Sequence, residues 1–227
     1  MTAMTMSLST WTPRCRQVQS IVAGCHPREP CQVLGVDRAR DRSRHLAASG
    51  TSVQWMLTFS ALRPLLITGP PAVGKSRVAL LLVDSVPPCA VIEVDDLRQL
   101  VKSGAAAPWQ PGEGSRQTEL AAHNTALLMT NFHDHGFNVI ATDVLLGDAF
   151  SAYADAPVRP LVVHLRVTFA EGLRRAGTRR VHLTDDEFQL LHESEQGASV
   201  ADVSIDTTDL SPEGCATQIL RLWTVGW

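Results

Sequence analysis

The sequence of 227 residues lacks the features that mark membrane and secreted proteins. Its longest strictly apolar run, residues 78–83, is far shorter than the ~20 residues that a membrane-spanning helix needs. No stretch near the start joins basic residues to an apolar run of ~7–15 residues, so we expect no secretory signal. The five cysteines form no C-x-x-C pair, which argues against a zinc site or a disulfide framework and favours a reducing, cytoplasmic setting.

Charged and aromatic side chains are also scarce. Charged residues make up 19% of the chain and aromatic residues 5%, whereas 44% of the residues are hydrophobic. The apolar fraction suffices for a buried core, and the charge is too low for a disordered chain. The net charge of −3 argues against a general nucleic-acid-binding protein.

Positive charge gathers at the start of the chain. Residues 1–55 hold seven arginines, no lysine and three acidic residues. They show no sustained helical or strand periodicity, and we predict a disordered or non-native extension there. The arginine-rich residues 39–45 would also suit a phosphate-binding tail, and the composition would suit a transit peptide. Because Met56 shortly precedes the first convincing strand, we expect the folded domain to span residues 56–227.

From residue 62 onward, short apolar strands alternate with longer helices, which is the pattern of a parallel sheet built from β-α-β units. The strands are predicted at residues 65–68, 90–94, 138–142, 161–165 and 202–206. The helices are predicted at residues 75–84, 96–103 and 115–135, and a loop rich in Gly, Ala and Pro at residues 104–114. This order predicts an α/β fold.

One motif outweighs the others. It has the form G-x-x-x-x-G-K-[ST] and reads Gly69-Pro70-Pro71-Ala72-Val73-Gly74-Lys75-Ser76. The chain has two lysines against eighteen arginines, so a lysine at the required position runs against its own composition. An apolar strand precedes the motif and an apolar helix follows it, as a phosphate-binding loop requires. We therefore predict a nucleoside triphosphate site made of these eight residues and Arg77.

The chemistry of the motif assigns roles to its members. Gly69 and Gly74 let main-chain amides approach phosphate oxygens, and the helix that follows directs its positive end to the anion. Lys75 is expected to hold the β- and γ-phosphates, and the Ser76 hydroxyl is expected to bind Mg²⁺. ATP and Mg²⁺ are the cofactors that we predict.

Acidic residues follow two further strands at the edge where parallel sheets bind ligands. Asp95 and Asp96 come after the second strand, and Asp143 follows the third. A carboxylate beside a phosphate site can orient Mg²⁺ or accept the proton of an attacking hydroxyl. We predict that Asp143 joins Ser76 as a Mg²⁺ ligand, although Asp96 equally suits a helix N-cap and Asp143 a turn.

The motif, the segment Val94-Asp95-Asp96-Leu97 and a later arginine-rich stretch resemble small P-loop kinases of the shikimate kinase and chloramphenicol phosphotransferase type. The likeness covers residues 62–223, in which the motif is specific and the remainder rests on order and spacing. It implies a three-layer P-loop NTPase fold with a five-stranded parallel sheet in the order 2-3-1-4-5 and a helical lid at about residues 173–184. It also implies that Asp95 is the base for the acceptor hydroxyl.

The resemblance further assigns a lid and an acceptor pocket. Lid arginines of such kinases stabilise charge on the transferred phosphoryl group, and Arg175 and Arg179 are the candidates here, with a solvated helix face as the alternative. Residues 105–124 would build the acceptor pocket, in which Trp109 stacks on a ring and Arg116 contacts polar groups beside Asp95 and Asp96. The sequence shows no recognisable set of shikimate-binding arginines in this insertion, so the acceptor stays open.

The expected function is ATP-dependent phosphotransfer to a hydroxyl of a small molecule. The alternative is an ATP-binding protein or ATPase that acts as a nucleotide-dependent switch, but neither an N-K-x-D motif nor an extra domain supports it. The sequence leaves open ATP against GTP and monomer against homodimer. We expect no nucleic-acid partner and no membrane partner.

Overall fold

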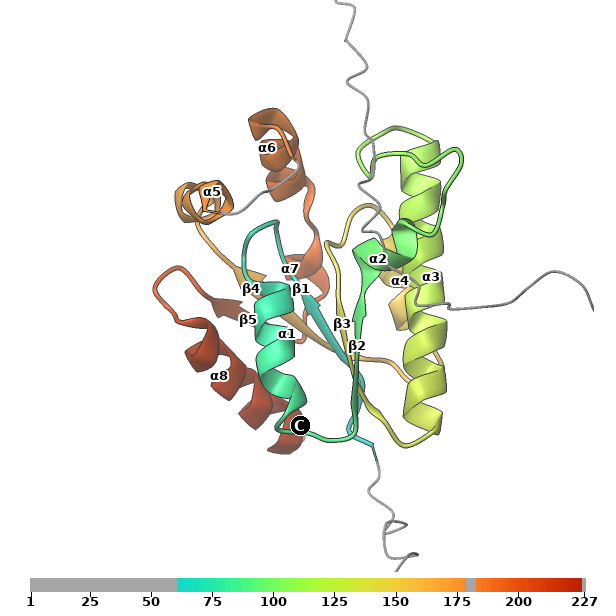
Figure 1. Cartoon of the computed structure of the whole chain (residues 1–227), viewed down its shortest axis with the longest axis vertical. Coiled ribbons are helices and arrows are strands. Elements are labelled where there is room, and N and C mark those ends of the chain that lie inside the picture. The colour runs from blue at the N-terminus through green and yellow to red at the C-terminus, as the bar shows by residue number, and fades with distance from the viewer. Residues whose placement is uncertain (1–60, 179–182, 226–227) are drawn as a thin grey trace, which may run out of the picture. The chain divides into compact units, whose positions relative to one another are not determined.

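The computed structural model describes residues 61–178 and 183–225, so the predictions for residues 1–55 and for Arg179 lie outside the described residues. Strands and helices alternate along the described chain (Figure 1). The strands are β1 (Leu65–Thr68), β2 (Cys89–Glu93), β3 (Asn138–Thr142), β4 (Leu161–Arg166) and β5 (Val203–Asp206). The helices are α1 (Lys75–Val83), α2 (Val94–Arg98), α3 (Glu113–Asp134), α4 (Ala149–Ala154), α5 (Phe169–Gly177), α6 (Asp185–Ser194), α7 (Gly197–Val200) and α8 (Pro212–Val225).

The strands form one parallel sheet in the order β2-β3-β1-β4-β5, which confirms the predicted order. The central strand β1 is buried along its whole length, which explains why its residues are apolar up to Thr68. In the register of the sheet, Ile67 lies opposite Thr142 of β3, and Thr68 lies opposite His164 of β4. The turn after β1 therefore opens between the carboxyl ends of its two neighbours.

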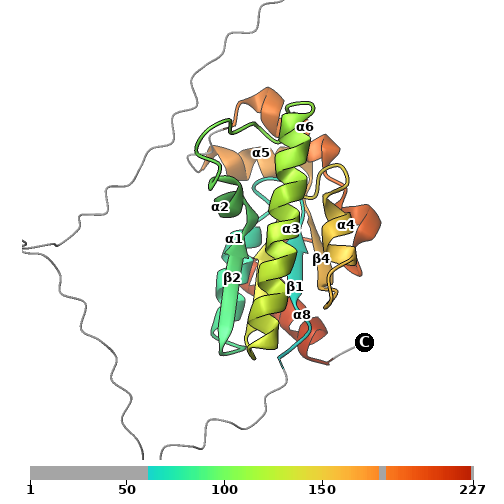
Figure 2. The ribbon, with the colours of Figure 1, turned by 90° about the vertical axis from the view of Figure 1, so that its right-hand side faces the viewer.

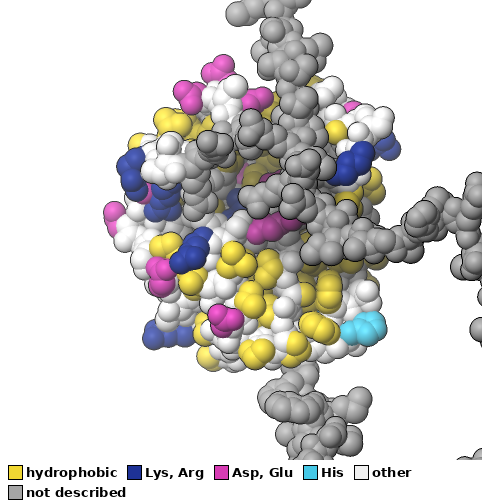
Figure 3. All heavy atoms as spheres, in the orientation of Figure 1, with side chains coloured by type: hydrophobic (Ala, Val, Ile, Leu, Met, Phe, Trp, Pro, Cys, Tyr) yellow, Lys and Arg dark blue, Asp and Glu magenta, His cyan; other side chains and the backbone are white. Residues whose placement is uncertain are grey.

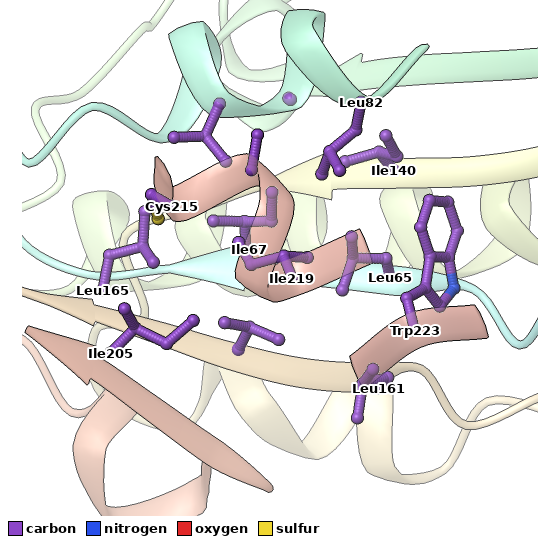
Figure 4. Packing of buried hydrophobic residues seen from close by; sticks show 14 of the residues in the cluster. Leu65, Ile67, Leu82, Ile140, Leu161, Leu165, Ile205, Cys215, Ile219 and Trp223 are labelled. Carbon is purple, nitrogen blue, oxygen red and sulfur yellow. The ribbon is translucent and has the colours of Figure 1, made fainter. Parts of the chain in front are cut away.

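Helices cover both faces of the sheet and give three layers (Figure 1). Figure 2 looks onto the face that α3 and α4 cover. Alternation along β1 sends Leu65 and Ile67 to the core under α1 and α8, and Leu66 to the core under α3 and α4. Figure 4 shows Ile219 and Trp223 of α8 packed over the first of these cores. The Trp223 indole N–H also donates to the carbonyl of Arg63 at 2.6 Å, which fixes α8 to the start of β1.

The element boundaries differ from the predicted ones around β2. This strand ends at Glu93, and α2 begins at Val94 instead of residue 96, so Asp96 is not the N-cap of the helix. Asp95 and Asp96 lie instead in the first turn, where the helix dipole favours carboxylates. Beyond Arg98 the amides of Leu100 and Val101 bond three residues back, in the tight turns that close many helices.

Helices α5 and α6 lie near the carboxyl edge of the sheet, at the top of Figure 1. The end of α5 belongs to the predicted lid, and α6 begins just after it. Phe169 of α5 packs against Phe188 and His192 of α6, with ring centroids 5.9 and 5.3 Å apart. We refer to α5 and α6 together as the lid helices. Among the described residues, none of the helices combines the length and the hydropathy needed to cross a membrane.

Hydrophobic side chains gather on one part of the surface. Figure 3 shows them over α1 and the nearby end of β2. Leu80 of α1 is an exposed hydrophobic residue, whereas Val78, Ala79 and Leu82 of the same helix are buried. A homodimer, one of the two expected assembly states, would have this apolar surface available.

A chain that begins at Met56 should fold as the full chain does, because both described cores consist of residues between 62 and 223. We expect its thermal midpoint to lie within a few degrees of that of the full chain, measured by circular dichroism. Insolubility of the shorter chain, or loss of its cooperative transition, would contradict the predicted domain boundary.

Candidate active site

The phosphate-binding motif forms the turn between β1 and α1, and α1 begins at Lys75 as predicted. Gly69 has a φ of 137°, which L side chains rarely adopt. A Cβ at this position would also clash with the carbonyl oxygen of Leu165 in β4. The turn thus lies close to the neighbouring strand, and the first amides of α1, which have no helical acceptors, point toward the turn.

Lys75 folds back over this turn. Its ammonium donates to the carbonyl oxygens of Gly69 at 2.7 Å and Pro70 at 3.0 Å. Burial lowers the pKa of Lys75, and the negative charges around it oppose that effect. The carboxylates come from three separate segments and belong to Asp95 and Glu93, to Asp143, and to Glu195. The ammonium is therefore the centre of charge of the site.

Glu93, the last residue of β2, connects the motif to the sheet. Its Oε2 accepts hydrogen bonds from the Ser76 hydroxyl at 3.0 Å and from the Thr142 hydroxyl. Glu93 is not among the predicted site residues. Its position could have indicated it, because it is a lone carboxylate at the end of an apolar strand, two residues before Asp95. Hydroxyl and carboxylate oxygens are hard ligands of the kind that Mg²⁺ prefers, so this group of residues fits the predicted metal.

Asp143 follows β3 directly and is buried. Its Oδ2 accepts a hydrogen bond from the Tyr153 hydroxyl at 2.8 Å. Burial raises the pKa of Asp143 to about 7, while the bond from Tyr153 and the charge of Lys75 act in the opposite direction. Its role as a Mg²⁺ ligand stays a prediction, because the carboxylate that the Ser76 hydroxyl contacts is that of Glu93.

Asp95 is exposed on the first turn of α2, and Arg98 follows it by one turn of the same helix. The Arg98 side chain is half-buried, and burial lowers its pKa while the charges of Asp95 and Asp143 raise it. Within residues 61–178 and 183–225, its guanidinium donates to no other group. Arg98 is not among the predicted site residues, although a helical residue three positions after Asp95 is expected to lie on the same face of the helix.

Arg175 of α5 lies beside the motif, yet its donors are all occupied. Its guanidinium, which has five N–H groups, donates to five oxygens. These are a carboxylate oxygen of Glu171, the carbonyls of Val73, Thr207 and Thr208, and the Thr207 hydroxyl. Arg175 therefore joins α5 to the motif and to the loop after β5 that contains Thr207 and Thr208.

The residues predicted for the acceptor pocket lie on separate elements, and no hydrogen bond among the described residues joins Arg116, Trp109 and Asp96 to one another. Arg116 donates two hydrogen bonds to Glu113, at 3.0 and 2.9 Å, on an exposed part of α3. Trp109 is half-buried in the loop between α2 and α3, and Asp96 is exposed on α2. An acceptor that uses Arg116 would have to displace its pairing with Glu113.

No protein-family model matches this chain, and no curated protein matches it by sequence. Solved structures do resemble it. A sugar kinase from a Janibacter species has a TM-score of 0.56 at 15% identity and is matched over 71% of this chain and 94% of its own. Shikimate kinase from Acinetobacter baumannii, in complex with shikimate, has a TM-score of 0.51 at 20% identity, over 72% and 93%. The APS kinase of Mycobacterium tuberculosis, in complex with AMPPNP and APS, also has a TM-score of 0.51, at 19% identity over 70% and 96%.

These likenesses show the fold. The parallel sheet in the order β2-β3-β1-β4-β5, with helices on both faces, is that of the P-loop kinases. The predicted fold is therefore confirmed, and so is the resemblance at the level of the fold.

Replacing Asp143 by Asn should change how stability depends on pH. The folded state keeps the proton of Asp143 up to a pH of about 7, whereas the unfolded chain loses it near 3.8. The folded state thus binds more protons between these values, and the Asp143 contribution to stability falls as the pH rises through this window. Asn stays neutral, so the free energy of unfolding of the variant should gain on the wild type by at least ~1 kcal/mol between pH 5 and pH 8.

Urea unfolding of the nucleotide-free protein measures this difference. The exposed Asp148→Asn, which makes the same change outside the site, should follow the wild-type profile. Parallel profiles of Asp143→Asn and wild type would contradict the prediction.

Arg175→Ala should loosen both the lid helices and the loop that contains Thr207, because five hydrogen bonds are lost at once. We expect a loss of about 1–3 kcal/mol of stability and weaker binding of Mg-AMPPNP by calorimetry. Arg175→Lys should not restore binding, because an ammonium cannot reproduce the guanidinium fork.

Arg174→Ala is the matched control, because Arg174 also pairs with Glu171 but is 67% exposed and contacts no part of the motif. Its stability should stay within ~0.5 kcal/mol of the wild type. Equal losses in the two alanine variants would show that the pairing with Glu171, and not the bridge to the motif, matters.

Proposed function

We propose that this protein is an ATP-dependent kinase that transfers the γ-phosphate to a hydroxyl group of a small molecule. The observation that carries the proposal is the position of three groups at one edge of the sheet. They are the partly buried ammonium of Lys75 within its glycine-rich turn, the pair of Ser76 and Glu93, and the exposed carboxylate of Asp95. The confirmed fold supports this reading, since its solved neighbours include kinases of sugars, shikimate and APS.

In the proposed reaction, the acceptor oxygen attacks the γ-phosphorus and the bond from phosphorus to the bridging oxygen of ADP breaks. Asp95 accepts the proton that the acceptor hydroxyl gives up. Lys75 and the first amides of α1 neutralise the phosphate oxygens, and because Lys75 is bound to its own turn, its ammonium is already oriented before nucleotide binds.

Ser76 and Glu93 are the residues that would hold Mg²⁺, directly or through water, with Asp143 as the further predicted ligand. When bound, the ion supplies positive charge to the β- and γ-phosphates. The carboxylates around Lys75 fit this assignment, because without a cation they would repel a triphosphate.

Arg98 favours an acceptor with an acidic group. It is half-buried beside Asp95, and its guanidinium has no hydrogen-bond acceptor among the described residues. A half-buried guanidinium without a full set of acceptors can form charge-assisted hydrogen bonds with a carboxylate or phosphate of the ligand. Hydroxy acids and phosphorylated alcohols should therefore be better acceptors than neutral alcohols.

Asp95→Asn should abolish transfer and leave nucleotide binding intact. We expect the rate to fall by ~10²–10⁴, the usual contribution of a general base. The dissociation constant of Mg-AMPPNP, measured by calorimetry, should stay within about threefold because Asp95 is not part of the turn. Asp84→Asn, at the far end of α1, makes the same change away from the site and should leave both quantities unchanged.

The acceptor is first sought by thermal-shift screening of hydroxylated metabolites and antibiotics in the presence of AMPPNP. A true acceptor raises the midpoint in step with its concentration over its dissociation constant. If wild type hydrolyses ATP at one rate with every compound, and Asp95→Asn does the same, the protein is an ATPase or switch and the kinase proposal is wrong.

A further inference from the structure

A second buried polar cluster lies next to the phosphate-binding turn and takes no part in the proposed reaction. Its centre is Glu195, which follows α6 directly, and its other members are Thr68, His164 and Gly197. The side chains of Glu195 and His164 are each only 5% exposed, and Thr68 is completely buried. A buried carboxylate is costly unless its hydrogen bonds are satisfied, so its contacts call for an explanation.

Both oxygens of Glu195 are satisfied. Oε1 accepts from the Thr68 hydroxyl at 3.2 Å and from the amide of Gly197 at 2.6 Å. Oε2 lies 2.9 Å from Nε2 of His164. Burial alone would raise the pKa of Glu195, but the bonds from His164, Gly197 and Thr68 outweigh it and hold the pKa below its ordinary value. The group is therefore a fixed negative charge, and it acts on Lys75 across the turn.

The backbone around Glu195 is fastened as well. The amide of Gln196 donates to the carbonyl of Leu145, which lies beyond β3, at 2.9 Å. A Cβ on Gly197 would clash with the Glu195 carboxylate and would meet Thr68 within 3 Å. Leu145 after β3, Thr68 at the end of β1 and His164 within β4 thus contact two successive residues at the exit of α6.

The position of the cluster in the chain gives it a function. Thr68 immediately precedes Gly69, the first residue of the phosphate-binding motif, and Glu195 immediately follows the second lid helix. At the other end of the motif, Arg175 of the first lid helix donates to the carbonyl of Val73. The lid helices and the residue that follows them are therefore bonded to both ends of the turn. Arg175 contacts Val73 near the end of the turn, and Glu195 contacts Thr68 just before its start.

We propose that Glu195 is a positioning residue of the nucleotide site, which fixes the exit of the lid helices to the strand that carries the phosphate-binding turn. This inference rests on the proposed function. Through Thr68 the carboxylate holds the start of the turn, and through Gly197 and His164 it holds the exit of α6 against β4. Nucleotide in the turn then restrains the lid helices, and loss of the carboxylate uncouples the two.

Glu195→Gln removes the charge of the carboxylate and can keep its hydrogen bonds, whereas Glu195→Ala removes both. The amide oxygen of Gln can still accept from Thr68 and Gly197. Its NH₂ can donate to His164 if the imidazole moves its proton to Nδ1, which faces the Ser204 hydroxyl at 3.5 Å. Ala removes all three bonds. Glu193→Gln is the matched control, because Glu193 is exposed on α6 and accepts a hydrogen bond from Gln189 of the same helix.

The measurements are the dissociation constant of Mg-AMPPNP by calorimetry and hydrogen exchange of residues 185–194 with and without AMPPNP, well below the thermal midpoint. We expect Glu195→Ala to weaken binding at least tenfold and to lose the slowing of exchange that nucleotide causes in wild type. Glu195→Gln should stay within about threefold of wild type, and Glu193→Gln should equal it. Thr68→Val, which removes one bond and keeps the shape, should weaken binding severalfold and serves if Glu195→Ala does not fold.

The outcomes separate this inference from the proposed function. If wild type binds AMPPNP but Glu195→Ala and Thr68→Val bind it equally well and only melt earlier, the cluster is packing alone and the inference is wrong. If wild type does not bind AMPPNP at all, the proposed function fails, and this inference fails with it.

Discussion

The site depends on one constraint, which is that Lys75 is a partly buried cation surrounded by carboxylates. Removing an ammonium from water is costly, and here two carbonyls of its own turn and four surrounding carboxylates compensate for the loss. Those carboxylates sit at the end of β2, on α2, after β3 and after α6, so each must be held in place by the fold. A triphosphate would add more negative charge to this group, so we expect a divalent cation to bind with it and offset that charge.

The sheet order makes this convergence possible. β1 lies in the centre, and its neighbours β3 and β4 end beside the turn that it carries. β2 lies one strand further out, and Glu93 spans that distance to Ser76 and Thr142. The proposed base on α2 and the lid helices are then placed by connections that leave the same edge. One local turn thus acquires partners that are distant in sequence.

The local features of this fold could be predicted from the sequence, whereas the pairings could not. The motif, the central strands and the start of α1 follow from short-range patterns, and so does the strand order once the resemblance is accepted. Glu93 with Thr142, and Thr68 with Glu195, join residues 49 and 127 positions apart, and no periodicity marks such pairs. The end of β2 was misplaced by one residue because Val94 continues the apolar run into α2. The N-cap role, the alternative that the sequence allowed for Asp96, is therefore wrong, and Asp96 lies in the first helical turn.

The resemblance suggested Arg175 as a lid residue, but it did not indicate which hydrogen bonds the guanidinium makes within the protein. Its position beside the motif agrees with a lid arginine, yet every donor is engaged by the protein. The bond to Val73 is the longest of the five, at 3.4 Å, and its acceptor is a neutral carbonyl of the motif itself. A phosphate oxygen is a stronger acceptor than a carbonyl, because the bond is then assisted by charge on both sides. Nucleotide in the turn would therefore replace this bond first, while the bonds to Glu171 and Thr207 keep the lid helices attached.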